Sequence, residues 1–352
     1  MEIRAKPVDG GEKVSISMKG ADHKGIVHAV VSVLADLSFS IERAEVKTED
    51  GMASDEFLCV PPCNRMSSTE DLEKLIQSRL GMYSDFRGEV TGLLLSMPLF
   101  RSSETEVWSG TWGQTRVAVK VMTSRGKDEK LKEEMAIWKQ LRHPNICTFY
   151  GLCSFHGGGE KIGIVMELCC TDLTTRVHSS SSLRRRAKLR WMRDLSSALS
   201  HVHAMQIIHR DVKPANVLLD GSERVRLADF GLARMTTDRL HNTGETGTYR
   251  YMAPEVIRSD PYSEECDSFS FGMTMWEVWT RERPFVNLSP LQTAYAIASG
   301  IRPDMKKVRK EKGASKVISK CLQHDPEERM RMVEAMRSLS SLIRARSSCA
   351  PW

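Results

Sequence analysis

The stretch that decides the fold reads His209-Arg210-Asp211-Val212-Lys213-Pro214-Ala215-Asn216, and Asp229-Phe230-Gly231 follows it along the chain. Together the two stretches place an Asp, a Lys, an Asn and a second Asp at the spacing of a phosphoryl-transfer site. A lone copy of either stretch can arise by chance. The occurrence of both stretches in this order, together with the further motifs below, is very improbable by chance.

Three further motifs accompany these stretches. One precedes them, Val117-Ala118-Val119-Lys120, and two come after them, Gly247-Thr248-Tyr249-Arg250-Tyr251-Met252-Ala253-Pro254-Glu255 and Asp325-Pro326-Glu327-Glu328-Arg329. With them the chain resembles the eukaryotic protein-kinase family over roughly its last three quarters. The resemblance implies an α+β, bilobal protein-kinase fold over residues 92–345, with a β-rich small lobe, a hinge and a helical large lobe.

The resemblance also implies roles for the polar groups of the two stretches. Asp211 would accept or orient the proton of the substrate hydroxyl as it attacks the γ-phosphate of ATP. Lys213 would steady that phosphate, and Asn216 and Asp229 would hold Mg²⁺ ions. His209 and Phe230 are expected to be packed structural residues.

Nucleotide contacts are implied on both sides of these stretches. Lys120 would hold the α- and β-phosphates and needs a carboxylate to orient it. Glu133 and Glu134 are both available, and the register of the family's helix favours Glu134. The base would lie against Val107, Ala118 and Leu218, with Met166 at the back of the pocket and main-chain groups of Glu167 and Cys169 at the adenine edge. Asp172 would accept a ribose hydroxyl, or would simply cap a helix.

Three features of the large lobe carry further expectations. Lys213 and Thr248 favour serine and threonine over tyrosine as the acceptor residue. Glu255 should pair with Arg329, and Asp267 should anchor the backbone of the catalytic loop from a buried helix. These last two roles are structural.

The segment between Gly231 and Ala253 contains Thr236, Thr237, Thr243 and Thr246. A phosphate on this segment would pair with Arg210 and order it. We expect phosphorylation at Thr243 or Thr246. The alternative is a threonine-rich mobile loop.

The chain departs from the family at the phosphate-covering loop. Phe100-Arg101-Ser102-Ser103-Glu104-Thr105-Glu106-Val107 stands where the family has G-x-G-x-x-G, and all three glycines are missing. Glycine lets backbone N–H groups close over the phosphates, and Glu104 and Glu106 add negative charge.

Taken together, the motifs predict an ATP- and Mg²⁺-dependent serine/threonine protein kinase. The alternative is a pseudokinase-type binding or scaffold protein with weak nucleotide binding. Val107–Trp112 resembles the tyrosine-kinase-like group of serine/threonine kinases.

The segment before the kinase-like part has a different pattern of apolar residues. Strands are expected at Lys13–Met18, Ile41–Lys47, Ala53–Val60 and Phe86–Val90, and helices at residues 26–37 and 67–80. This βαββαβ order is a ferredoxin-like plan, and over residues 11–91 it resembles the ACT domain, a small-molecule regulatory module. Residues 1–10 and 346–352 are expected to be tails.

The ACT-like resemblance implies an amino-acid effector near Asp22 and Gly25, and a homodimer through this domain. Gly25 would let the backbone approach the ligand closely. Equally, Gly25 makes only a tight turn and Asp22 caps the helix. We expect a regulatory or dimerising role.

Composition sets limits on the rest. A net charge of +6 and a pI near 8.8 favour anionic partners such as nucleotides without requiring nucleic acid. No apolar run is long enough to span a bilayer. Nine scattered cysteines favour a reducing, cytoplasmic location. The resemblance to protein kinases implies a role in signal transduction. The tight pair Cys59 and Cys63 is expected to be structural rather than a redox or zinc site.

Two basic runs remain without an assigned role. The first contains Arg184, Arg185, Arg186, Lys188, Arg190 and Arg193 in the start of an expected helix, and the second is Lys306–Lys312. The first run is either a docking surface for an acidic partner or, as the default, a solvated helix face. The second has the same default.

Overall fold

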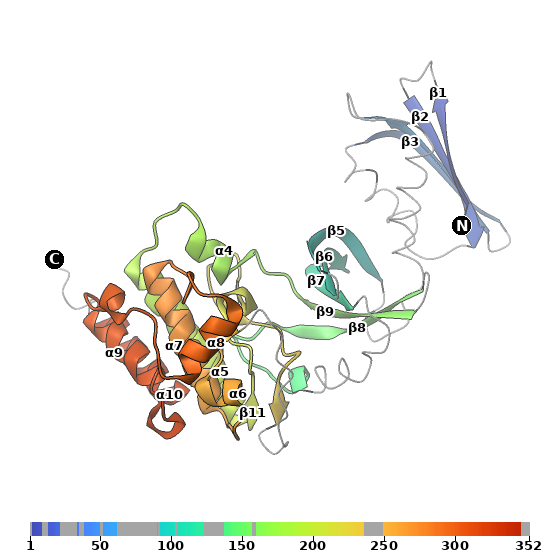
Figure 1. Cartoon of the computed structure of the whole chain (residues 1–352). Helices are drawn as coiled ribbons and strands as arrows, with labels where there is room; N and C mark the ends of the chain where they lie inside the picture. Colours follow the sequence, from blue (N-terminus) through green and yellow to red (C-terminus); the bar gives the residue numbers. More distant parts are fainter. Residues whose placement is uncertain are drawn as a thin grey trace. The chain divides into compact units, whose positions relative to one another are not determined.

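We describe the protein from a computed structural model (Figure 1). The structure describes residues 2–8, 13–21, 34, 39–49, 52–61, 90, 92–102, 105–122, 137–156, 160–235 and 249–345. The chain divides into two compact units. One comprises residues 1–127 with 149–168, and the other residues 128–148 with 169–352.

The chain begins with a four-stranded antiparallel sheet in the order β1-β2-β4-β3, whose strands are β1 (Glu2–Val8), β2 (Lys13–Ala21), β3 (Ser40–Glu49) and β4 (Met52–Val60). Alternating residues bury one face. Val14 lies opposite Cys59 and Ile16 opposite Phe57, and all four side chains are buried. The period-2 pattern of β2 and β4 thus gives the sheet one apolar face.

Three of the expected strands are confirmed as β2, β3 and β4, but the expectation of a tail at residues 1–10 is wrong. Residues 2–8 form β1, an edge strand paired with β2. Its signal is weak because Arg4 and Lys6 are exposed and Pro7 lacks an N–H donor, which only an edge strand tolerates. The expected helices lie outside the described residues except for Leu34, which is helical and buried. Of the expected last strand, only Val90 is described.

Cys59 is a core residue of this sheet. Its side chain is fully buried, and burial raises the pKa of the thiol to about 11. A protonated thiol is a poor metal ligand and nucleophile. This supports the structural interpretation for Cys59, while Cys63 lies outside the described residues.

A second, five-stranded sheet has the order β5-β6-β7-β9-β8, with strands β5 (Leu93–Arg101), β6 (Thr105–Trp112), β7 (Thr115–Met122), β8 (Phe149–His156) and β9 (Glu160–Glu167). One face carries a buried cluster that includes Leu95, Trp108, Val119 and Val165. Gly110 of β6 allows close approach to β5, because a Cβ atom there would lie 2.5 Å from the carbonyl oxygen of Leu94. This sheet confirms the β-rich part of the expected fold.

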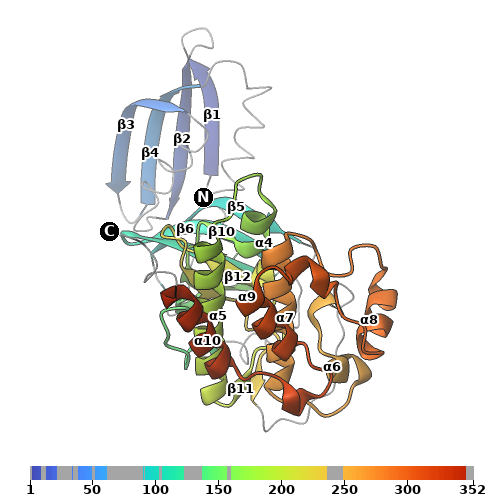
Figure 2. The ribbon, with the colours of Figure 1, turned by 90° about the vertical axis from the view of Figure 1, so that its left-hand side faces the viewer.

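The second unit is mainly helical, with α4 (Leu173–His178), α5 (Arg185–Ala204), α6 (Pro254–Arg258), α7 (Glu265–Thr280), α8 (Pro290–Ala298), α9 (Lys312–Cys321) and α10 (Met332–Arg344). Helix α7 is buried on all sides from Cys266 to Val278, because apolar residues occur around its whole circumference in this stretch. Helix α10 packs along α5 and α9 packs against α7 (Figure 2). Gly272 permits the second contact, because a Cβ atom there would lie 2.9 Å from Cys321 Cβ.

Short elements complete this unit. A three-stranded sheet has the order β10-β12-β13 and a two-stranded one pairs β11 with β14; their bounds are β10 (Thr171–Asp172), β11 (Ile207–Ile208), β12 (Val217–Leu219), β13 (Val225–Leu227) and β14 (Arg234–Met235). The 3₁₀ helices are η2 (Pro214–Asn216), η3 (Tyr249–Tyr251), η4 (Met305–Val308) and η5 (Pro326–Glu328). Among the described helices, none combines the length and apolar character needed to cross a membrane.

Candidate active site

The stretch His209–Asn216 forms a loop from the end of β11 to the start of β12, and Asp267 of α7 holds its backbone. The Asp267 carboxylate accepts hydrogen bonds from the N–H groups of His209 and Arg210, each at 2.8 Å. Arg210 has a φ of 70°, a left-handed conformation that costs an L-residue free energy. The predicted anchoring role of Asp267 is confirmed.

The carboxylate of Asp267 is fully buried. Burial alone would raise its pKa, but the hydrogen bond from His203 Nε2, at 2.9 Å, and contacts with His209 outweigh burial, so the pKa lies below its ordinary value. Asp267 therefore stays charged, and a charged acceptor binds the two loop amides more strongly than a neutral one.

His209 is a packed structural residue, as expected. Its side chain is buried, and its ring nitrogens contact the Ala228 carbonyl oxygen at 3.1 Å and the Asp211 N–H at 3.3 Å. Phe230 is also fully buried and contacts the rings of His209 and Trp138, with centroids 4.9 Å and 5.6 Å away. The contact of the Phe230 ring with His209 thus helps to fix the position of the loop.

Asp211 lies at the centre of a polar cluster. Its Oδ2 atom accepts hydrogen bonds from Lys213 Nζ at 2.6 Å and Asn216 Nδ2 at 2.8 Å. Its Oδ1 atom is buried and has no hydrogen-bond partner among the residues that the structure describes. The carboxylate is thus oriented through one oxygen and keeps the other as an acceptor.

Asp229 follows β13 and lies beside the loop, since the N–H of the preceding residue, Ala228, donates to the Asn216 carbonyl oxygen at 3.0 Å. Asp229 also has a left-handed backbone, with a φ of 65°. Because the Asn216 amide nitrogen is bound to Asp211, its side-chain oxygen is the atom that can serve as a metal ligand. Carboxylate and amide oxygens are ligands that Mg²⁺ accepts, so the donor set fits the expected ion.

Four residues predicted to contact the nucleotide share one face of the five-stranded sheet. In the strand register Val107 lies opposite Lys120, and Ala118 lies opposite Met166. Lys120 and Ala118 are two residues apart on β7, so the alternation of a strand puts all four on the same side. The buried cluster around Val119 and Val165 occupies the other side. Glu134 lies outside the described residues.

The other expected nucleotide contacts come from β9, β10, β12 and the residues between β9 and β10 in the sequence. Leu218 of β12 lies opposite Asp172 in the register, Glu167 ends β9, and Cys169 is partly buried. The Asp172 carboxylate caps α4, accepting from Thr175 N at 2.9 Å and Thr175 Oγ1 at 2.7 Å. The structure therefore supports the helix-cap alternative for Asp172, and ribose binding stays a prediction.

The hairpin between β5 and β6 replaces the glycine-rich loop. Ser102 closes it: the Ser102 N–H donates to the Thr105 carbonyl oxygen at 2.9 Å, and the Thr105 N–H donates to Ser102 Oγ at 3.1 Å. Phe100 lies opposite Val107 in the register and is 58% exposed. A serine-closed hairpin with an aromatic residue thus stands in place of glycines.

The expectation that Glu106 adds charge near the phosphates is wrong. Glu106 precedes Val107 on β6 and therefore points to the opposite face of the sheet. There it accepts a hydrogen bond from Trp108 Nε1 at 3.1 Å and lies 3.8 Å from Arg101 Nε. Its charge is compensated on that face. Glu104 lies outside the described residues.

Comparison with known families agrees with this geometry. The family model described as "Protein kinase domain" matches residues 105–339, about two thirds of the chain. The chain belongs to the protein kinase family.

Three relatives show how far the likeness to individual kinases extends. Serine/threonine-protein kinase STY17 of Arabidopsis thaliana is 29% identical over 370 residues, covering 94% of this chain and 64% of STY17. Serine/threonine-protein kinase STY46 of Arabidopsis thaliana is 33% identical over 68% of this chain and 42% of its own length. Serine/threonine/tyrosine-protein kinase HT1 of Arabidopsis thaliana is 28% identical over 71% of this chain and 66% of HT1. The chain spans less than two thirds of each of these relatives.

The predicted ion pair between Glu255 and Arg329 of the kinase domain is confirmed. The guanidinium binds both carboxylate oxygens, at 2.5 Å and 2.7 Å, and both side chains are buried. Arg329 also donates to three main-chain oxygens, those of Gln323, His324 and Glu265. This one side chain thus joins α6, α7 and the segment before η5.

Sequence reasoning missed one further buried acid of the kinase domain, Glu277 of α7. Its carboxylate is fully buried, accepts from Tyr251 Oη at 2.6 Å and contacts His178 Nε2 at 2.9 Å. Burial, and then the charge of Glu277, raise the pKa of Tyr251 far above its ordinary value, so its hydroxyl remains a donor. The available signal was an acidic residue, Glu277, directly between the apolar residues Trp276 and Val278.

The threonines expected to be phosphorylated, and Thr248, lie in residues 236–248, outside the described part of the kinase domain. The guanidinium of Arg210, their expected partner, lies 5.6 Å from the ring centroid of Tyr262. Phosphorylation of this segment therefore stays a prediction.

Proposed function

We propose that this kinase transfers the γ-phosphoryl group of ATP to serine and threonine hydroxyls of proteins. The observation that carries the proposal is the arrangement of Asp211, a buried carboxylate whose Oδ2 atom is bound by Lys213 and Asn216 while Oδ1 has no partner in the described part of the chain. An oriented acceptor of this kind is what an attacking hydroxyl requires.

In the proposed reaction the substrate hydroxyl donates its hydrogen bond to Asp211 Oδ1. As the hydroxyl oxygen bonds to the γ-phosphorus, the bond from that phosphorus to the β-phosphate oxygen breaks and ADP leaves. The hydroxyl proton passes to the Asp211 carboxylate. Lys213, whose Nζ atom lies 2.6 Å from Asp211 Oδ2, is positioned to offset charge on the transferred group.

The same proposal assigns ATP and Mg²⁺ to the remaining polar groups. Asn216 and Asp229 would hold Mg²⁺, which when bound offsets charge on the phosphates. Lys120, oriented by Glu134, would hold the α- and β-phosphates. The common face of Val107, Ala118 and Met166 supports base binding there.

A second candidate is a pseudokinase-type binding or scaffold protein. The observation that favours it is the hairpin closed by Ser102, which lacks the glycines that let backbone N–H groups approach phosphates. The pairing of Glu106 with Arg101 and Trp108 removes one electrostatic objection to nucleotide binding. We therefore favour the enzyme.

The test is phosphoryl transfer from Mg-ATP to a generic protein substrate. Asp211→Asn and Asp229→Asn should each lower the rate on the order of 10²–10³-fold, because each removes one group that acts on the reacting atoms. Asp260→Asn, at an exposed carboxylate paired with Arg258, is the matched control. Hydrolysis of the product should yield phosphoserine and phosphothreonine. Equal rates for wild type and Asp229→Asn, with ATP binding intact, would favour the scaffold.

For the N-terminal sheet we propose an ACT-like regulatory role. The pairing of β2 with β4 and of β4 with β3 agrees with the ferredoxin-like plan predicted for residues 11–91, whereas β1 takes the edge of β2 that this plan gives to its last strand. An amino acid would bind near Asp22 and Gly25 and change kinase activity, and the sheet would support a homodimer. Calorimetric titration of the full chain with each common amino acid tests effector binding, with Gly25→Val as the blocked control. Sedimentation tests the dimer.

We further propose a reducing, cytoplasmic location and a role in signal transduction. None of the seven described cysteines forms a disulfide bond, and five of them are buried: Cys59, Cys147, Cys153, Cys266 and Cys321. Free thiols are usual in reducing compartments. After purification without oxidant, all thiols should react with a thiol reagent once the chain is denatured, whereas disulfides in freshly isolated protein would contradict this.

A further inference from the structure

We propose that the helical unit carries a docking surface for an acidic segment of a partner protein, and that a bulky apolar side chain of this segment enters an adjoining cavity. The docking surface consists of six exposed cations: Arg184, Arg186, Lys306, Arg309, Lys310 and Lys312. It is separate from the phosphoryl-transfer site and does not depend on the proposed catalytic activity.

Charge is concentrated in the two segments that supply this surface. Residues 184–193 and 306–320 contain thirteen Lys and Arg residues and a single acid, Glu311, and so carry a net charge of +12. Because the whole chain carries +6, all other residues together carry −6. The positive charge of the protein is therefore a local property of these segments.

An ion pair joins the two segments in space although they are far apart in sequence. Arg185 Nε of α5 lies 2.5 Å from Glu311 Oε2, which directly precedes α9. Lys188 is held there as well, since its Nζ atom donates to the Trp279 carbonyl oxygen at 3.2 Å. The one acid in the region is thus neutralised by Arg185, and the neighbours of both residues, Arg184, Arg186, Lys310 and Lys312, are left to face solvent.

The six cations of the docking surface make no ion pair with any residue in the described part of the chain, in contrast to Arg185 and Lys307. Like charges gathered on one surface raise the free energy of the folded chain. An anionic partner relieves the repulsion, and rim charges of this kind chiefly set association rate and partner choice. A flexible segment rich in Asp and Glu fits this requirement.

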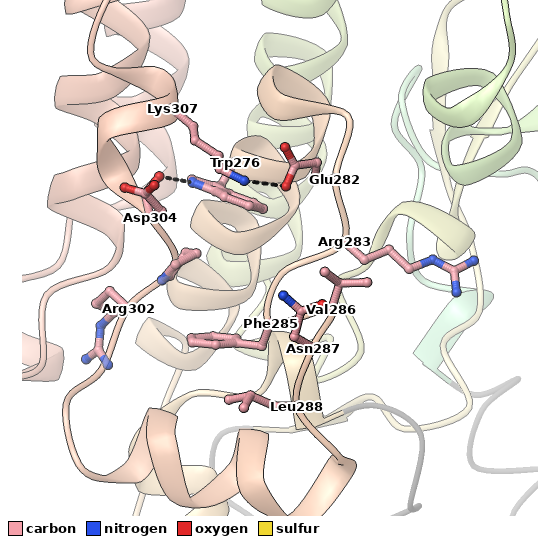
Figure 3. Close-up of a pocket in the computed structure, with 11 residues that line it drawn as sticks. Trp276, Glu282, Arg283, Phe285, Val286, Asn287, Leu288, Arg302, Asp304 and Lys307 are labelled. Carbon is pink, nitrogen blue, oxygen red and sulfur yellow. Dashed lines mark hydrogen bonds and ion pairs between the residues drawn. The ribbon is translucent and has the colours of Figure 1, made fainter.

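A cavity lies at the η4 end of the docking surface, where Lys307 is part of the lining (Figure 3). Its volume is about 260 Å³, and Trp276, Phe285, Val286 and Leu288 supply apolar wall. Pockets for whole small-molecule ligands are typically about 300–1,000 Å³, so this one has the size of a single large side chain. Val286 is 58% exposed at the cavity, and a bound side chain would cover it.

Three of the polar side chains around the cavity already have partners, so the main contribution of the cavity is apolar contact. Lys307 Nζ pairs with Glu282 across the rim, and Trp276 Nε1 donates to the Asp304 carbonyl oxygen at 3.1 Å (Figure 3). Arg302 donates to the carbonyl oxygens of Leu322 and Ile297. Charge outside and an apolar cavity beside it together favour an acidic peptide with one apolar anchor over a flat lipid headgroup layer.

The experiment measures binding of a fluorescent peptide to the full chain, in which glutamates flank a single phenylalanine. The triple variant Lys306→Glu/Arg309→Glu/Lys310→Glu should weaken binding about tenfold or more. The control triple Arg331→Glu/Arg337→Glu/Arg344→Glu has the same net charge, uses exposed residues outside both segments, and should bind like wild type.

Two further arms use the unchanged protein. Replacing the peptide phenylalanine by alanine should weaken binding by about tenfold. Raising salt from about 0.1 M to about 1 M, which shortens the screening length from about 10 Å to about 3 Å, should also weaken it. The proposal is overturned if both triple variants bind alike, if the alanine peptide binds as well as the phenylalanine peptide, or if phosphatidylserine vesicles bind at this surface and the peptide does not.

Discussion

Replacing Asp267 by Asn tests whether a buried charge in α7 holds the catalytic loop. The carboxylate accepts from His209 N, Arg210 N and His203 Nε2 at 2.8–2.9 Å. An Asn side chain offers one oxygen, so its NH₂ group must face one of these donors. A hydrogen bond to a charged group contributes about 1.5–3 kcal/mol, and breaking a buried charged contact costs about 3–5 kcal/mol. We expect Asp267→Asn to lower the free energy of unfolding by about 3–5 kcal/mol.

Urea unfolding of the helical unit, followed by tryptophan fluorescence, measures this loss. Asp304→Asn is the matched control, because Asp304 is exposed and caps η4 through Lys306 N, a contact that contributes about 1 kcal/mol. A loss for Asp267→Asn no larger than that of the control would refute the reasoning.

The pH dependence provides a second check on Asp267. Its folded-state pKa is depressed, so its contribution is present above the unfolded pKa of about 3.9 and is lost as pH falls through the lower folded value. The difference between wild type and Asp267→Asn should therefore be constant near neutral pH and shrink only in strong acid. A difference that shrank between about pH 8 and pH 6 would point to another group.

The remaining predictions concern three other contacts. Arg329→Met should cost about 4–5 kcal/mol and Glu255→Gln about 3 kcal/mol in urea unfolding, since Arg329 also holds three carbonyl oxygens; equal costs would contradict this. Burial, and then the charge of a neighbouring histidine, lower the pKa of His143, so its contribution is lost as pH falls below about 6.5. His143→Gln should reduce the change in melting temperature with pH between about pH 7.5 and 5.5. Phe100→Gly with Ser102→Gly should lower the KM for ATP about tenfold in steady-state kinetics; an unchanged KM would show that the hairpin does not limit binding.

Much of the catalytic loop could be predicted from the sequence, because a buried ionisable residue in a motif requires a partner. Asp267, Glu255 and Arg329 would be too costly to bury unless paired. Once the motifs place them, their partners follow, and the structure has them as predicted. The β-rich and helical parts of the kinase domain follow from the same motifs.

Other features could not be predicted because they depend on long-range geometry. The compensation of Glu106 by Arg101 depends on the pairing of β5 with β6, and the sequence pattern alone did not give that register. Strand β1 is stabilised by pairing with β2 rather than by its own residues. The contact of Arg185 with Glu311 joins residues 126 positions apart, and neither basic run contains a local signal for the other.

The backbone of Asp229 has a consequence for attempts to stabilise this protein. Its φ of 65° is a conformation in which glycine has no steric penalty, whereas only a carboxylate can be the expected metal ligand. Selection for heat resistance alone should thus enrich glycine at this position and recover sturdier molecules that no longer work. Activity and thermal stability therefore favour different residues at position 229, so libraries made to stabilise the protein should keep Asp229 unchanged.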